Sequence, residues 1–303
     1  MKKISAVQRF FLCFIFVFVL FACNRKDEAV DYRPEFAANT SGTKILIWGF
    51  PSYTYCESAE LIVRYLNKHL TGVKIVIKAC TSWDEYLQYL NDNKFDITMV
   101  NGIEALDATK HGYSIFGKIK DDSQFSTVIF SRKDANIQAV SDLKGEKIAL
   151  VPSNMIPGTM MPLLFLFEKG LNVNKDIEIF PVSSFESTIL STYLNKSKAG
   201  LCMKRKWDVY VRDHPTMLDK IELKWETPAL INNALLIKAN TDREIVAELS
   251  SLFFQIHDSK EGRLGLEQLE ISGFETADSE TYVPMLDFKK RYDAVIHIIN
   301  PSK

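Results

Sequence analysis

The chain has 303 residues, of which 47% are hydrophobic and 25% are charged, an ordinary globular composition with room for two domains. Its formal net charge is −1, and losing the three basic residues of a predicted leader, so that 37 basic residues become 34 against 38 acidic ones, would bring it to −4. Neither value supplies the basic excess that holds a nucleic-acid backbone, which excludes a nucleic-acid-binding protein.

The first 22 residues are typical of a signal peptide. A positive region at the start is formed by Lys2, Lys3 and Arg9. Residues 10–22 are apolar without a charge, which is too short for a membrane-spanning helix of about 20 residues. The run ends in Ala22-Cys23, which resembles a bacterial lipobox, with an unusually bulky Phe21. We therefore expect Cys23 to become the acylated (palmitate-bearing) first residue of a membrane-tethered protein, against the alternative of a buried N-terminal helix.

Residues 23–42 carry charges, Pro34 and Gly42 without an apolar period, which is typical of a flexible, lipid-anchored linker. A regular alternation of strands and helices follows. We predict strands at 44–48, 74–80 and 95–100, and helices at 57–70 and after Ser82. Ser82 and Glu85 have the spacing of a capping box. Strands that alternate with helices favour a parallel sheet with both faces covered.

The same pattern restarts near residue 126. We predict strands at 126–131, 147–151, 177–180 and 199–203, and helices at 159–169 and 185–195. A strand at 229–238 would return to the first unit, and Thr241 with Glu244 is predicted to cap the next helix. Further helix is expected to about residue 297.

Two similar α/β units with two chain crossings, near 127 and near 228, predict two lobes with a ligand cleft between them. Residues 43–127 plus 229–303 would form lobe 1, and residues 128–228 would form lobe 2, each a mostly parallel sheet flanked by helices. Ligands of open α/β sheets bind beyond the carboxyl ends of the strands. No metal-ligand spacing or cofactor motif is found in the sequence, so we expect neither group.

Six short segments carry a resemblance to a known family: 93–97, 140–149, 168–171, 183–187, 262–264 and 273–274. In their order they resemble the type II periplasmic solute-binding proteins of ABC importers, and more specifically the phosphate/phosphonate-binding family. The clearest is the run V-S-D-L-K-G-E-K-I-A at 140–149. The similarity spans residues 43–285 and implies a type II periplasmic-binding-protein fold.

The resemblance also implies an anion-gripping loop after the strand at 147–151, where the family has Ser-Thr-Ser-Gly. An ungapped alignment places Gly158 on the family glycine, and Met155, Ile156 and Pro157 on the hydroxyl residues. Each hydrogen bond to a charged group contributes about 1.5–3 kcal/mol, so this exchange would weaken anion binding strongly. A gap in the alignment would instead bring Ser153 and Asn154 into the loop.

Two further positions depart from the family. Phe185 occupies its histidine position, and Lys198 replaces an acidic residue.

Candidate ligand-binding residues follow the predicted strand ends. They are Tyr53, Trp83, Asn101, Ser126, Asn154, Thr159 and Arg205, with Glu104 and Trp207 also considered. Some of them have a purely structural alternative. Trp83 could be the first core residue of its helix, Asn101 could simply end a strand, and Arg205 could belong to a solvated turn at 204–206.

Three cysteines remain beyond Cys23. Cys56 and Cys80 would both lie just past neighbouring strands and could pair, since export permits disulfides. Buried free thiols are the alternative for these two and for Cys202.

These patterns favour a monomeric solute-binding lipoprotein that captures a small molecule for an ABC permease of the inner membrane. It would be extracytoplasmic and anchored in the bilayer of the cell membrane or outer membrane through Cys23. The alternative is a ligand-sensing extracytoplasmic binding protein that feeds a signalling partner. An enzyme has little support, because the chain has no Gly-x-Ser-x-Gly elbow and no Gly-rich phosphate loop.

Overall fold

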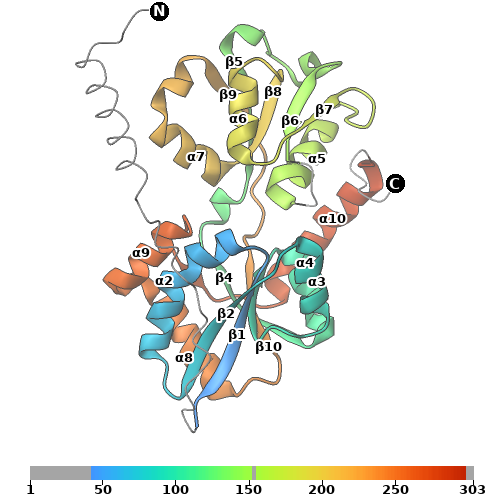
Figure 1. The fold of residues 1–303 in the computed structure, drawn as a ribbon. Helices are drawn as coiled ribbons and strands as arrows, with labels where there is room; N and C mark the ends of the chain where they lie inside the picture. The colour runs from blue at the N-terminus through green and yellow to red at the C-terminus, as the bar shows by residue number, and fades with distance from the viewer. Residues whose placement is uncertain (1–41, 152–154, 298–303) are drawn as a thin grey trace, which may run out of the picture. The chain divides into compact units, whose positions relative to one another are not determined.

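The computed structural model describes residues 42–151 and 155–297 (Figure 1). Thr43–Lys303 forms one compact unit, separate from Met1–Gly42. The predicted signal peptide, Cys23 and most of the linker lie outside the described residues, as does Asn154. Within the described ranges, no helix is long and apolar enough to cross a membrane.

The first sheet, sheet A, has six strands in the order β11-β4-β10-β3-β1-β2. Its strands are β1 (Lys44–Phe50), β2 (Val73–Ala79), β3 (Ile97–Val100), β4 (Tyr113–Ile119), β10 (Ala234–Lys238) and β11 (Phe274–Glu275). Strand β1 pairs in parallel with β2 and β3, whereas β10 and β11 pair antiparallel to their neighbours. The carboxyl ends of β1, β2 and β3 therefore share one edge of the sheet.

Helices cover both faces of sheet A. They are α2 (Tyr53–His69), α3 (Trp83–Asn91), α4 (Gly102–Ala108), α8 (Arg243–Phe254), α9 (Lys260–Gln268) and α10 (Val283–Val295). Buried apolar residues of α2, α8 and α9 pack with Trp48 of β1 in one cluster, while those of α3, α4 and α10 belong to another. Gly49 is needed where β1 passes Phe95, because an added Cβ would lie 2.3 Å from that ring.

The second sheet, sheet B, has five strands in the order β7-β6-β8-β5-β9. Its strands are β5 (Thr127–Arg132), β6 (Lys147–Leu150), β7 (Glu178–Pro181), β8 (Ala199–Met203) and β9 (Ile221–Glu226), and its helices are α5 (Met161–Glu168), α6 (Phe185–Tyr193) and α7 (Lys204–Asp213). Phe130 of β5 stacks on Trp207 of α7, with 4.7 Å between ring centroids, and anchors one face. Residues of α5 pack on the other face.

The two-sheet α/β architecture agrees with the sequence prediction, and most strands of each sheet run in the same direction. Both sheets are nevertheless mixed, because the strands that follow the two crossings, β5 and β10, run antiparallel to their neighbours. Strands β4, β9 and β11 were not predicted, and they add further antiparallel pairs.

Several predicted helix starts also need correction. Helix α2 begins at Tyr53, four residues earlier than expected, and the predicted turn at 204–206 is the first turn of α7. The predicted Thr241–Glu244 capping box is wrong, since the N-cap residue of α8 is Asp242 and its side chain makes no capping hydrogen bond. The Ser82 cap of α3 is confirmed, because its hydroxyl accepts a hydrogen bond from the Glu85 backbone N–H at 3.1 Å.

A network of hydrogen bonds ties together the two segments that cross between the sheets. One carboxylate oxygen of Asp122 accepts bonds from the Lys118 ammonium at 2.8 Å and from the Asn232 backbone N–H at 2.9 Å. The Tyr282 hydroxyl donates to the Asn232 carbonyl at 2.7 Å. Lys118 is buried and also pairs with Glu275. Buried and multiply bonded contacts of this kind fix the crossings as a unit.

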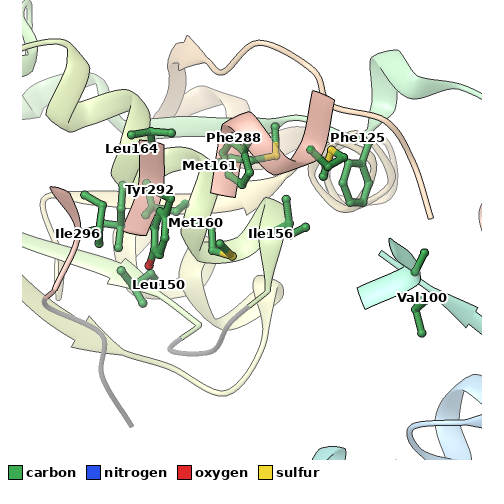
Figure 2. Packing of buried hydrophobic residues seen from close by; sticks show 14 of the residues in the cluster. Val100, Phe125, Leu150, Ile156, Met160, Met161, Leu164, Phe288, Tyr292 and Ile296 are labelled. Carbon is green, nitrogen blue, oxygen red and sulfur yellow. The ribbon is translucent and has the colours of Figure 1, made fainter. Parts of the chain in front are cut away.

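Helix α10 packs against α4, which follows sheet A, and against α5, which covers sheet B. We call this helix the strap because it links the two sheets. Figure 2 shows Phe288, Tyr292 and Ile296 together with Leu150 and Leu164, which belong to sheet B and α5; all are members of one buried cluster that also includes residues of α4. The Asn174 side chain donates to the Val295 carbonyl at 2.7 Å and accepts from the His297 N–H at 2.8 Å.

An ion pair adds to this strap. Arg291 of α10 lies 2.5 Å from the carboxylate of Glu168 at the end of α5.

The described cysteines Cys56, Cys80 and Cys202 are free and buried. Burial and, to a smaller extent, the neighbouring Cys80 raise the pKa of the Cys56 thiol to about 11.

Candidate ligand-binding site

Two aromatic candidates lie beyond the carboxyl ends of β1 and β2. Because Phe50 and Ala79 are register partners in this parallel pair, the turns that carry Tyr53 and Trp83 leave the same edge of sheet A. Tyr53 is the first residue of α2 and is 66% exposed, and Trp83 is the first residue of α3 and is 42% exposed. The structural alternative for Trp83, a buried first core residue, therefore does not hold.

Asn101 and Glu104 follow β3 at the same edge. The Asn101 side-chain oxygen caps α4 by accepting hydrogen bonds from the N–H groups of Ile103 and Glu104, and its amide nitrogen donates to the Glu104 carboxylate. Burial raises the pKa of Glu104 to about 7. Burial near the strand ends disfavours the charged form of this carboxyl group, so a large fraction of it is protonated at neutral pH.

Ser126 and Thr127 lie where the chain enters sheet B, and both are fully buried. The Ser126 hydroxyl donates to Glu226 at 2.8 Å, and the Thr127 hydroxyl donates to the carbonyl of Pro157. The Thr127 N–H in turn donates to the hydroxyl of Thr227 on the other crossing, at 3.0 Å. These hydroxyls tie the two crossings to each other and to Pro157.

The segment aligned with the family's anion grip is the π-helical turn η5 (Ile156–Met160), which leads into α5. All five of its residues are buried. The Thr159 hydroxyl donates to the Val151 carbonyl at 2.6 Å, so its proton is engaged within the fold. Gly158 faces Phe185, the residue at the family's histidine position, with 3.3 Å between a built Cβ and that ring. Asn154 lies outside the described residues.

Arg205 stands in the first turn of α7, just past the end of β8, and one of its terminal guanidinium nitrogens is buried without a hydrogen-bond partner. Burial lowers the pKa of Arg205, while the carboxylates of Asp121 and Glu270 act in the opposite direction. Its neighbour Lys206 pairs with Glu270 at 2.8 Å. Trp207, also considered from sequence, is a buried core residue.

The candidates thus form two groups. Tyr53, Trp83 and Asn101 share the carboxyl edge of sheet A, while Ser126, Thr159 and Arg205 belong to the first crossing, η5 and α7. Sequence reasoning missed Glu226, the partner of Ser126, because strand β9 was not recognised although its Ile-Glu-Leu-Lys-Trp-Glu alternation was a usable signal. Across the described ranges, no group of three His, Cys, Asp or Glu residues could hold a metal ion.

Two mixed sheets flanked by helices and joined by two crossings define a two-lobed periplasmic binding protein. A binding protein component of an ABC phosphonate transporter from Pseudomonas aeruginosa has the same fold, with a TM-score of 0.69 at 16% identity over 86% of this chain and 90% of that one. A Prochlorococcus marinus protein in complex with methylphosphonate gives a TM-score of 0.70 at 17% identity, over 82% of this chain and 98% of that one.

A third structure of this fold, a Xanthomonas citri protein bound to ATP, gives a TM-score of 0.68 at 16% identity, covering 84% of this chain and 98% of that one.

The chain belongs to the family of ABC transporter, phosphonate, periplasmic substrate-binding proteins, whose sequence profile matches residues 52–282. Members of this family are binding proteins of transporters and are not enzymes. A probable ABC transporter phosphite-binding protein of Prochlorococcus marinus is 22% identical over an alignment of 174 residues, which covers 53% of this chain. The chain matches 59% of that relative's length.

Proposed function

We propose that this protein is an extracytoplasmic lipoprotein that captures a small phosphonate-type anion and delivers it to an ABC permease. The observation that carries the proposal is the family match over residues 52–282. The names of the related proteins, which mention phosphite and methylphosphonate, support an anionic ligand of this class. We further propose that residues 43–127 plus 229–303 and residues 128–228 are the two lobes, and that they close on the ligand about the tied crossings.

In this proposal the anion is held differently from the family pattern. The hydroxyl groups of Thr127 and of Thr159 in η5 donate to backbone carbonyls, and Pro157 has no N–H to offer. Arg205 has an unpaired guanidinium nitrogen, and a guanidinium is well suited to bidentate bonding of phosphonate oxygens. We therefore propose that Arg205 supplies the positive charge. The proposed site as a whole comprises Tyr53, Trp83, Asn101, Ser126, Asn154, Thr159 and Arg205.

Calorimetric titration with methylphosphonate and phosphite tests this site. Arg205→Gln should weaken binding by about 10- to 150-fold, because a hydrogen bond to a charged group is worth about 1.5–3 kcal/mol. Arg212→Gln is the matched control, since Arg212 lies on the same helix, pairs with the adjacent Asp213 and is exposed. Equal affinity of both variants and the parent would refute the role of Arg205, and no binding of either anion would refute the ligand class.

Closure of the two proposed lobes can be measured separately. Small-angle scattering should show a smaller radius of gyration at saturating ligand, and an unchanged radius would count against capture by lobe closure.

The anchor is proposed from Cys23 and the apolar segment before it. In cells given an alkyne-tagged palmitate analogue, the protein should be labelled and recovered with membranes, and Cys23→Ala should abolish both. Cys56→Ala, which removes a buried thiol of the folded part, is the control and should keep the label. Labelling that survives Cys23→Ala would rule out this anchor.

A further inference from the structure

Three aromatic rings are stacked against sheet A, and the outermost of them, Trp83, follows the carboxyl end of β2. The Trp83 ring lies 5.2 Å from that of Tyr86, and Tyr86 lies 5.4 Å from Phe95, each pair with an interplanar angle of 28°. Tyr86 and Phe95 are fully buried, whereas Trp83 keeps 42% of its surface exposed. The stack therefore ends in an open indole surface.

The middle ring of the stack is held firmly. The Tyr86 hydroxyl donates to the Thr98 hydroxyl at 2.6 Å, and the Met99 carbonyl lies 3.2 Å from the same hydroxyl oxygen of Tyr86. Thr98 also donates to the Gly49 carbonyl of β1. Because its support is fixed to two strands, the exposed ring of Trp83 presents a preorganised flat surface, and ordering it on binding costs little entropy.

A partly desolvated carboxyl group lies near the middle ring of the stack. Glu104 is close enough to Tyr86 to raise the pKa of that phenol, after the larger effect of burial. The Glu104 carboxylate accepts a hydrogen bond from the Asn101 amide.

Trp83 contributes little to the buried core. It does not belong to the hydrophobic clusters of the described residues, although its stacking partner Tyr86 does. A large aromatic side chain left open at a strand edge where ligands bind is a natural contact for a ligand ring.

We propose that Trp83 is a specificity-determining residue that stacks on a planar, apolar substituent of the ligand. This inference rests on the proposed function and narrows it. The preferred ligands are phosphonates or phosphate esters that carry a ring, and methylphosphonate or inorganic phosphate lacks the group that Trp83 recognises. An aromatic pair adds to simple area burial, and a gain of about tenfold in affinity corresponds to ~1.4 kcal/mol.

Titration calorimetry with phenylphosphonate and methylphosphonate tests the inference. The parent protein should bind phenylphosphonate at least about tenfold more tightly. Trp83→Ala should bring the two affinities together by weakening phenylphosphonate alone, while Trp83→Phe should retain part of the preference. A role of Trp83 in folding only would weaken both ligands equally.

Fluorescence provides a second readout that does not depend on stability. Of the three other tryptophans, Trp48 and Trp207 are buried and Trp225 is half-buried, so the quenching by phenylphosphonate that comes from Trp83 is the part that should be lost in Trp83→Phe.

Equal binding of the two ligands by the parent, or a preference that survives Trp83→Ala, would overturn the inference and leave the proposed function standing. Failure of both ligands to bind would instead remove the proposed function, and the inference with it.

Discussion

Replacing Asn174 by alanine tests the strap formed by α10. The Asn174 amide makes two hydrogen bonds to backbone atoms at the end of this helix, of 2.7 Å to Val295 and 2.8 Å to His297. A protein hydrogen bond contributes about 1 ± 0.5 kcal/mol, so Asn174→Ala should lower the free energy of unfolding by roughly 1–3 kcal/mol. For a chain of this size, 1 kcal/mol corresponds to about 2–4 °C, and a loss of 2 kcal/mol should lower Tm by about 4–8 °C.

Urea unfolding gives the free energy, and amide hydrogen exchange shows where it is lost. Exchange should speed up at the end of α10, where the Asn174 side chain makes its two hydrogen bonds, and should change little in β1 or β2. Lys175→Ala is the matched control, since Lys175 is exposed in the same loop. If Asn174→Ala unfolds at the same urea concentration as this control, with unchanged exchange around Val295, the strap does not depend on the amide and the reasoning fails.

Three other predictions concern packing and titration. Gly200→Ala should destabilise the protein by about 1–3 kcal/mol in urea unfolding, because a Cβ would lie 2.4 Å from the Phe130 ring; stability equal to the parent would show that the ring can move aside. Glu104 has a folded pKa of about 7, above its unfolded value, so the folded state binds its proton more tightly than the unfolded state does. The free energy of unfolding should therefore fall as the pH rises from about 4.5 to about 7, by up to ~3 kcal/mol. Glu104→Gln should remove that part of the pH dependence, and identical pH profiles would contradict this. Native protein treated with iodoacetamide at pH 8 should react slowly at Cys56, whose pKa is raised to about 11 by burial, and rapid alkylation detected by mass spectrometry would refute the buried-thiol description.

Where hydrophobic periodicity is strong, the sequence was sufficient to predict the elements. The strand predicted at 199–203 is β8 with the same bounds, because its apolar run is buried on both faces and sits between a helix end and a basic segment. Strand β4 was missed because Gly117 and Lys118 interrupt its apolar pattern. The burial of Lys118 is possible because it pairs with the carboxylates of Asp122 and Glu275, and the local sequence pattern does not reveal these partners.

The candidate site was predictable in position more than in chemistry. The predicted strand ends indicated that Tyr53, Trp83 and Asn101 lie at one edge of sheet A. The structure agrees, because β1, β2 and β3 are parallel and their carboxyl ends share that edge. The hydrogen bonds that engage the Thr127 and Thr159 hydroxyls could not be foreseen, since their acceptors are backbone carbonyls at Pro157 and Val151, brought close only by the fold.

The position of α10 has a consequence for the order in which the two sheets can be joined. This helix follows all the strands of both sheets in the described part of the chain, yet Phe288, Tyr292 and Ile296 belong to the cluster that unites residues of both sheets. Chains tend to fold from the N-terminus during synthesis. Both sheets can form before α10 emerges, but their shared core stays open until the residues near 296 have been added. In a nascent chain the two sheets therefore stay loosely joined until this helix packs against residues of both.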